Sequence, residues 1–305
     1  MAGSGTVFLL IGLGYLARWL VILRAGDERA LNALVYYFAL PAFLVVNISA
    51  AEFTSQAAVF MAAGLAPVAT LLAAYLVMRV LGAKRDLVYL LAAATAFGSL
   101  AFFGVPYVEY VLGTGEPARL AALVVTGVAP LTVGLILVLL ELYQLRDAPA
   151  RWAARRVVGR LARNPLILAI AGGTILSLAQ AELPTVVDRA LVHLSSVTTP
   201  VALFSLGVFL FGRTYRGLCT ALGLSALRLL LIPAATLLTV AALGLPPLEG
   251  TVLVLMNGSP MAVNMIVLSS RYRFLQEEMA TTVLLSSLGS LLTLSLWAYL
   301  LDAIS

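Results

Sequence analysis

The chain has 305 residues, of which 62% are hydrophobic and 11% are charged, against roughly 25% charged residues in an ordinary soluble domain. This composition excludes a water-soluble globular protein, because too few polar residues remain to form its outer shell. Apolar runs of about 18 to 25 residues recur along the whole chain, and each is long enough to cross the hydrocarbon core of a bilayer. The composition therefore predicts an all-α integral membrane protein.

Ten membrane-spanning helices are predicted from these apolar runs. The expected spans are Thr6–Leu23, Leu31–Ile48, Gln56–Met78, Leu87–Val111, Leu120–Tyr143, Pro165–Ala179, Val186–Phe211, Leu218–Leu243, Gly250–Ser270 and Met279–Leu301. The residues before the first run carry no charged side chain, and Arg18 interrupts the run itself. We therefore interpret this run as a span and not as a cleaved signal peptide.

The distribution of basic residues supports the count of ten spans. Of the 19 Lys and Arg residues, fifteen follow odd-numbered spans, Arg119 and Arg189 lie in the opposite loops, and Arg18 and Arg228 fall inside spans. Because cytoplasmic loops retain Lys and Arg, this split predicts that both termini lie on the non-cytoplasmic side of the cell (inner) membrane. The net charge of +5 forms no long basic face, so nucleic-acid binding is not expected.

The spans divide into two halves of five helices. Residues 1–145 form the first half, residues 164–305 form the second, and a basic cytoplasmic linker over 146–163 joins them. The segment PVATLL that begins at Pro67 in span three resembles PAATLL at Pro233 in span eight. Because each half has an odd number of spans, the second half enters the membrane from the opposite side. Such inverted repeats are typical of secondary transporters.

The fourth and ninth spans contain Gly and Pro at membrane depth, in the segments Gly98–Pro106 and Asn257–Asn264. Proline removes a backbone donor and clashes with the preceding turn, so both spans are expected to be broken. Free backbone groups and the partly positive N-termini of half-helices favour an anionic solute. The alternative is that both segments merely kink for helix packing. The candidate substrate-binding residues are Ser99, Gly104, Pro106, Asn257, Gly258, Pro260 and Asn264.

Three more polar residues are candidates for the transport path. Arg228 would pair with a substrate carboxylate if it lay deep in the membrane, although we favour the interpretation that it snorkels to the cytoplasmic interface. Asn47, at the end of span two, either lines the path or caps a helix end. Glu109 is a candidate for proton coupling, with a simple loop position as the alternative. The broken segments hold no Asp or Glu, which disfavours a paired-acid ion site and leaves uniport open.

Enzymatic chemistry and metal or other cofactors are not expected. The chain contains one cysteine, Cys219, and one histidine, His193, too few for a zinc or iron–sulfur site. Acids and nucleophiles are too scarce in the spans to assemble the usual catalytic constellations. The favoured function is a secondary transporter for a small organic anion. A channel, or an ion-coupled symporter of another solute on the same fold, is the alternative.

Several short motifs occur in the order and spacing of a known family. They are Leu40–Phe43, Gly104–Pro106, Asn164–Pro165, Thr199–Leu203, Leu206–Gly207, Ser259–Tyr272 and Thr281–Ser287. On these residues the chain resembles the auxin efflux carrier family, which includes the plant PIN-FORMED carriers and bacterial permeases for malate and malonate. The resemblance covers nearly the whole chain.

The resemblance implies a ten-helix fold similar to that of bile-acid symporters and sodium/proton antiporters, in which spans four and nine cross at their broken centres. It further implies that spans 1, 2, 6 and 7 form a scaffold through which a homodimer assembles. Spans 3–5 and 8–10 would form a mobile transport domain with elevator-type alternating access, carrying a dicarboxylate or an auxin-like acid. The family commonly has Asn where this chain has Ser99, and a hydroxyl offers fewer donors than an amide.

Overall fold

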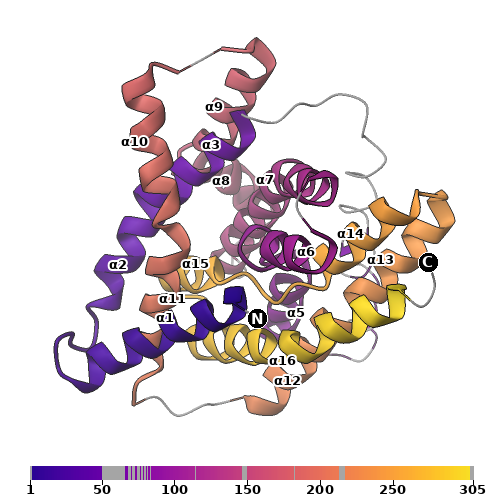
Figure 1. Ribbon diagram of the computed structural model, residues 1–305. Helices are drawn as coiled ribbons and strands as arrows, with labels where there is room; N and C mark the ends of the chain where they lie inside the picture. Colours follow the sequence, from indigo (N-terminus) through magenta and orange to yellow (C-terminus); the bar gives the residue numbers. More distant parts are fainter. Residues whose placement is uncertain are drawn as a thin grey trace. The chain divides into compact units, whose positions relative to one another are not determined.

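Helices make up all the regular elements of the part of the chain that the structure describes. The computed structural model describes residues 2–49, 84–113, 115–145, 150–181, 183–212 and 217–302, with isolated positions between 66 and 82. Within these ranges the chain forms α-helices (Figure 1) and π-helical turns. An isolated bridge joins Gly98 to Met261. The prediction of an all-α protein is confirmed.

Within the described ranges, five helical segments are long and apolar enough to cross a membrane. They are Glu28–Ser49, Glu116–Gln144, Thr185–Leu210, Leu218–Leu243 and Gln276–Asp302, and shorter apolar helices occupy Leu9–Trp19, Leu100–Leu112 and Pro165–Ala179. Most of the predicted spans therefore coincide with an apolar helix, as a multi-pass membrane protein requires. The third predicted span, Gln56–Met78, lies largely outside the described residues.

The chain folds into two compact units, each made of segments that are far apart in the sequence. Unit 1 comprises Met1–Glu52, Val133–Thr214 and Val263–Gln276. Unit 2 comprises Phe53–Thr132, Tyr215–Ala262 and Glu277–Ser305. The units therefore do not follow the sequence halves 1–145 and 164–305, because each unit takes helices from both halves.

Unit 1 contains helices from the beginning, the middle and the end of the chain. They are α1 (Ala2–Trp19), α2 (Glu28–Leu34), η1 (Val35–Ala39), α3 (Leu40–Ser49), the C-terminal end of α7 (Glu116–Gln144), α8 (Ala150–Leu161), α9 (Pro165–Ala179), α10 (Thr185–Ser196), α11 (Thr198–Leu210) and α15 (Asn264–Tyr272). In this unit α1 packs along α11, and α3 packs against α9 and α10 (Figure 1).

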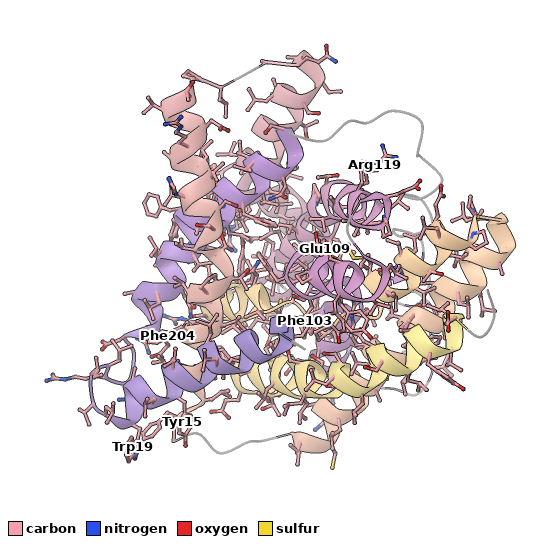
Figure 2. The ribbon with its side chains drawn as sticks, in the orientation of Figure 1. Tyr15, Trp19, Phe103, Glu109, Arg119 and Phe204 are labelled. Atoms are coloured by element: carbon pink, nitrogen blue, oxygen red, sulfur yellow. The ribbon has the colours of Figure 1, made fainter. Side chains whose placement is uncertain are left out.

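Two glycines bring α1 and α11 into backbone contact. A Cβ atom on Gly14 would collide with the carbonyl oxygen of Phe204, and one on Gly207 would collide with the carbonyl oxygen of Ile11. Tyr15 on α1 and Phe204 on α11 mark this contact in Figure 2. Small residues at such places let membrane helices gain van der Waals contact that lipid would otherwise supply. Close backbone packing at these two glycines therefore helps to stabilise the pair.

Asn164 joins three segments of unit 1. Its buried Nδ2 atom donates to Tyr36 Oη at 2.9 Å and to Tyr272 Oη at 3.0 Å. Its Oδ1 atom accepts from the amide of Leu166 at 2.9 Å and so caps the N-terminus of α9. The side chain thereby connects α9 to η1 and to the C-terminal residue of α15.

Unit 2 contains the remaining described helices. They are α5 (Arg85–Ala96), η2 (Leu100–Gly104), α6 (Val105–Leu112), the N-terminal part of α7, α12 (Leu218–Ala226), η3 (Leu227–Leu231), α13 (Ile232–Leu243), α14 (Pro247–Asn257) and α16 (Gln276–Asp302). The indole Nε1 of Trp297 donates to the carbonyl oxygen of Leu229 at 3.0 Å and joins α16 to η3. In addition, α13 packs against α14.

Each of the three π-helical turns ends two residues before a proline. The prolines are Pro41 after η1, Pro106 after η2 and Pro233 after η3. A proline ring clashes with the carbonyl four residues earlier and cannot donate a hydrogen bond to it. A wider turn ahead of the proline relieves this clash, so the helix continues past the proline instead of stopping.

Candidate functional site

Two interrupted helices meet inside unit 2. The helix α5 ends at Ala96, and α14 ends at Asn257. Beyond these ends, the amide of Ser99 donates to the carbonyl oxygen of Pro260 at 2.8 Å, and the amide of Ala262 donates to the carbonyl oxygen of Phe97 at 2.9 Å. Backbone groups freed at membrane depth need a partner inside the protein. Here the two interrupted segments satisfy each other.

The break in the fourth span is displaced from the proline that predicted it. The residues that lie outside the helices are Phe97 to Ser99, whereas Pro106 lies exposed in the first turn of α6, after η2. Proline is tolerated there because a first-turn residue needs no intrahelical donor. The prediction that Pro106 marks the break is wrong, while the break beside Ser99 and the break over 258–263 lie within the predicted segments.

Arg228 extends from η3 into the meeting point of the interrupted segments. Its side chain is 1% exposed. The Nε atom donates to the carbonyl oxygen of Ser259 at 3.0 Å, and Nη1 donates to that of Thr95 at 2.8 Å. The Thr95 carbonyl lies in the last turn of α5, and the Ser259 carbonyl lies two residues past the end of α14. The backbone carries partial negative charge at the C-terminal end of a helix. The favoured interpretation of a snorkelling arginine is therefore wrong, because the guanidinium is held by carbonyls inside the protein.

The positive charge of Arg228 has no carboxylate partner among the described residues. An ion pair within 4.0 Å joins Arg160 to Glu141 in unit 1, and Arg228 forms no such pair with a described residue. Two carbonyl dipoles satisfy donors of the guanidinium but do not neutralise its full charge. A buried charge without a counter-ion is costly, so an anion that entered this region would gain strong electrostatic stabilisation.

Small hydroxyl side chains surround the same backbone. The Oγ atoms of Ser99 and Ser259 are buried and have no hydrogen-bond partner among the described residues. Ser286 Oγ accepts from the amide of Met261 at 3.2 Å, and the Nδ2 of Asn257 donates to Thr236 Oγ1 at 3.1 Å. The two unpaired hydroxyls can donate to a bound carboxylate.

Gly98 is the point at which the backbone and the guanidinium come closest. A Cβ atom at this position would collide with Nη2 of Arg228 and would lie 3.2 Å from Ser259 Oγ. At Gly104, a Cβ atom would lie 2.7 Å from the sulfur of Met256, which shows that η2 and α14 are also close. Glycine is therefore needed at Gly98 for Arg228 to reach its two carbonyls.

Replacement of Gly98 by alanine is expected to displace Arg228 and to destabilise unit 2 by about 1–3 kcal/mol, the usual cost of overpacking a filled core. Thermal unfolding of the purified protein in detergent measures this loss. The matched control is Gly223→Ala in α12, where an added Cβ meets no atom within 4 Å and alanine favours the helix. Equal unfolding temperatures for Gly98→Ala and Gly223→Ala would contradict the close approach.

The predicted site residues fall into three groups. Unit 2 brings Ser99, Asn257, Gly258 and Pro260 to the interrupted segments, together with Arg228 and, on η2, Gly104. Glu109 is exposed on α6 (Figure 2). Unit 1 contains Asn47 and Asn264.

The two asparagines of unit 1 have different surroundings. The amide nitrogen of Asn47 donates to the carbonyl oxygen of Phe43 one turn earlier at 2.7 Å, so the side chain bonds its own helix. Asn264 begins α15, and its buried Oδ1 has no partner among the described residues. The role of Asn47 and Asn264 in the transport path stays a prediction.

Three residues that contact Arg228 or the interrupted segments were not predicted as site residues. The carbonyls of Thr95 and Ser259 hold the guanidinium, and Ser286 accepts from the amide of Met261 in the second interrupted segment. Backbone acceptors leave no trace in a residue pattern, so Thr95 could not have been found. Ser259 lies inside the predicted broken segment, and this position was the signal that could have identified it as a site residue.

Comparison with known proteins agrees with this description. A family model described as "Membrane transport protein" matches residues 6–298. A Rhizobium meliloti protein that bears the name of a malonate transporter is 28% identical over 96% of this chain and 93% of its own length. An uncharacterized transporter of Methanocaldococcus jannaschii is 25% identical over 97% of this chain and 96% of its own.

A rice protein named as an auxin efflux carrier component is 32% identical over 46% of this chain and 40% of its own length. The resemblance that the short motifs carried is thus confirmed over almost the whole sequence. The chain therefore belongs to the membrane transport protein family, the family of the auxin efflux carriers, and is a multi-pass membrane transporter.

Proposed function

We propose that the protein is a secondary transporter that carries a small organic anion through unit 2, with Arg228 as the group that attracts its carboxylate. The observation that carries the proposal is the buried guanidinium beside two interrupted helices, without a carboxylate partner among the described residues. A carboxylate would supply the missing negative charge, and guanidinium–carboxylate pairs are among the stronger hydrogen-bonded contacts. The hydroxyls of Ser99 and Ser259 add donors for the remaining oxygens.

A short dicarboxylate is the first substrate to test. The name of the Rhizobium meliloti relative points to malonate, and the name of the rice relative points to an auxin-like acid. Both ligands present a carboxylate to Arg228. The hydroxyl of Ser99 offers one donor, whereas an amide at this position would offer two. This difference favours a compact anion whose other oxygens accept hydrogen bonds from other donors.

For transport we propose elevator-type alternating access, with unit 1 as scaffold and unit 2 as the moving part. Support comes from the composition of the units, since unit 1 holds the helices of predicted spans 1, 2, 6 and 7, and unit 2 holds those of spans 4, 8 and 10. In this proposal ten spans cross the cell (inner) membrane, both termini lie outside, and the scaffold helices pair in a homodimer. Glu109 remains the candidate for proton coupling.

Ligand-induced thermal stabilisation tests the proposed substrate class. A ligand that binds the folded protein stabilises it by about 2.7 kcal/mol at a hundredfold excess over Kd. Malonate, malate and indole-3-acetate are compared with malonamide, which has the shape of malonate without its charge. We expect the unfolding temperature to rise with malonate concentration and to stay constant with malonamide. Stabilisation by neutral or cationic solutes alone would overturn the proposal.

A further inference from the structure

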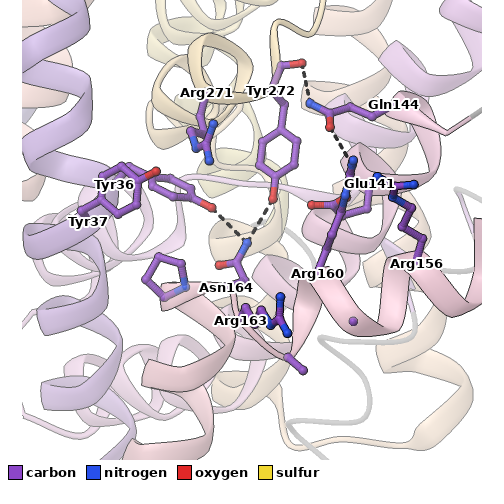
Figure 3. Close-up of a pocket in the computed structure, with 13 residues that line it drawn as sticks. Tyr36, Tyr37, Glu141, Gln144, Arg156, Arg160, Arg163, Asn164, Arg271 and Tyr272 are labelled. Atoms are coloured by element: carbon purple, nitrogen blue, oxygen red, sulfur yellow. Dashed lines mark hydrogen bonds and ion pairs between the residues drawn. The ribbon is translucent and has the colours of Figure 1, made fainter.

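Unit 1 contains a separate pocket that the proposed transport site does not use. It has a volume of about 890 Å³ and lies among η1, the C-terminal end of α7, α8, the start of α9 and the end of α15 (Figure 3). This volume is within the range of small-molecule sites. Its lining residues all belong to unit 1, so the pocket is distinct from the surroundings of Arg228.

The lining of this pocket is strongly basic. Four arginines face one acidic residue, Glu141; the arginines are Arg156, Arg160, Arg163 and Arg271. Arg160 Nη1 pairs with Glu141 Oε2 at 3.0 Å and also donates to Gln144 Oε1 at 3.0 Å. The acidic residue is therefore already neutralised, and the other arginines leave an excess of positive charge.

Two of the arginines keep their donors available. Arg163 and Arg271 are exposed, and among the described residues neither guanidinium has a hydrogen bond or an ion pair. The guanidinium of Arg271 lies 5.8 Å from the ring centroids of both Tyr36 and Tyr37. Cation–π contact of this kind orients an arginine over the ring faces without using its N–H donors. Arg271 therefore lies on the pocket wall with N–H donors available to a ligand.

The rest of the wall is rigid and also suited to an anion. Asn164, paired with Tyr36 and Tyr272, fixes the phenol rings, and Gln144 Nε2 donates to the carbonyl oxygen of Tyr272 at 3.3 Å. Asn164 and Pro165 open the 15-residue helix α9 at the pocket. The N-terminus of a helix contributes partial positive charge. The pocket therefore combines positive charge, hydrogen-bond donors and the N-terminus of a helix.

We infer that this pocket binds the phosphate group of an anionic ligand. A phosphate group offers several strong acceptor oxygens to guanidinium forks, whereas a single carboxylate satisfies only one fork. Anionic phospholipid headgroups and free phosphate share this chemistry, and basic pockets between membrane helices commonly hold such headgroups. Next to the pocket, Tyr37 is 44% exposed and Phe38 is 59% exposed, which provides an apolar surface for an acyl chain.

Binding to the full-length protein, purified free of lipid in detergent, tests this inference. One arm adds inorganic phosphate, and a second adds phosphatidylglycerol or phosphatidylcholine. Thermal stabilisation and native mass spectrometry report binding. The test variant is Arg163→Gln with Arg271→Gln, and the matched control is Arg189→Gln on α10, an exposed arginine that does not line the pocket. We expect phosphatidylglycerol to bind in preference to phosphatidylcholine. The affinity of the double variant for phosphatidylglycerol should be lower by about tenfold or more, because two charge-assisted contacts are lost.

Each outcome decides the inference. Binding of phosphatidylglycerol without binding of inorganic phosphate supports a lipid headgroup as the ligand. Binding of inorganic phosphate alone supports a soluble anion. In either case the binding must be lost in the double variant and retained in Arg189→Gln. Wild-type binding must also weaken with added salt, which checks the charge dependence without any substitution. Absence of binding in both arms, or equal binding by the double variant, overturns the inference. Loss of malonate binding instead of phosphate binding would also overturn it, since the pocket would then belong to the substrate path.

Discussion

Replacement of Arg228 by glutamine is expected to abolish saturable malonate uptake, with a loss of about a hundredfold or more in transport efficiency, equivalent to about 2.7 kcal/mol. Glutamine removes the full positive charge that we propose attracts the substrate. It is also too short to reach the carbonyls of both Thr95 and Ser259, which Arg228 satisfies at 2.8 and 3.0 Å. Uptake by purified protein in proteoliposomes measures the effect.

A lysine at the same position separates the charge from the hydrogen bonds. Arg228→Lys keeps the charge but lacks the planar fork that serves two carbonyls at once. We expect it to retain more transport than Arg228→Gln and to unfold at a lower temperature than the wild type. Near-normal uptake by Arg228→Gln in a folded protein would refute the proposed role.

Replacement of Gly207 by valine is expected to separate α1 from α11 and to prevent unit 1 from folding stably. The new side chain would collide with the backbone of Ile11, which cannot move aside as a flexible side chain can. Overpacking alone costs about 1–3 kcal/mol, and contact with backbone places this variant at or above the upper end. Yield of monodisperse protein and the unfolding temperature report the loss.

The matched control for this prediction is Gly172→Val in α9. It makes the same substitution in a helix of the same unit, at a position where an added Cβ meets no atom within 4 Å. We expect this control to fold about as stably as the wild type, because valine is no worse than glycine in a helix interior. If both variants fold equally well, the glycine contact does not stabilise the pair.

The apolar helices could be predicted from the sequence because their boundaries are set by local composition. The predicted spans Pro165–Ala179 and Leu218–Leu243 end at the same residues as the helical segments of the structure. Asn164, part of a motif that marked the start of one of them, caps that helix. Span seven was predicted as one helix, but it is divided at Val197 into α10 and α11. Pro200 lies four residues after Ser196, the last residue of α10, where a proline ring clashes with the helix backbone.

The features that required tertiary contacts could not be predicted. The helix α8 lies inside the predicted linker 146–163. Because this helix contains several arginines, it does not form an apolar run and was not predicted. The depth of Arg228 depended on two backbone carbonyls that no residue pattern reveals. Likewise, Gly98 marked the break at Phe97 to Ser99 in the sequence, but the pairing of this segment with Pro260 and Ala262 could not be predicted from it.

An experimental structure of the protein with bound malonate tests the central claim most directly. We predict that a malonate carboxylate contacts the guanidinium of Arg228, with the hydroxyl of Ser99 or Ser259 donating to its oxygens. Malonate bound away from Arg228, or a protein carboxylate paired with that guanidinium, would contradict the proposed anion site.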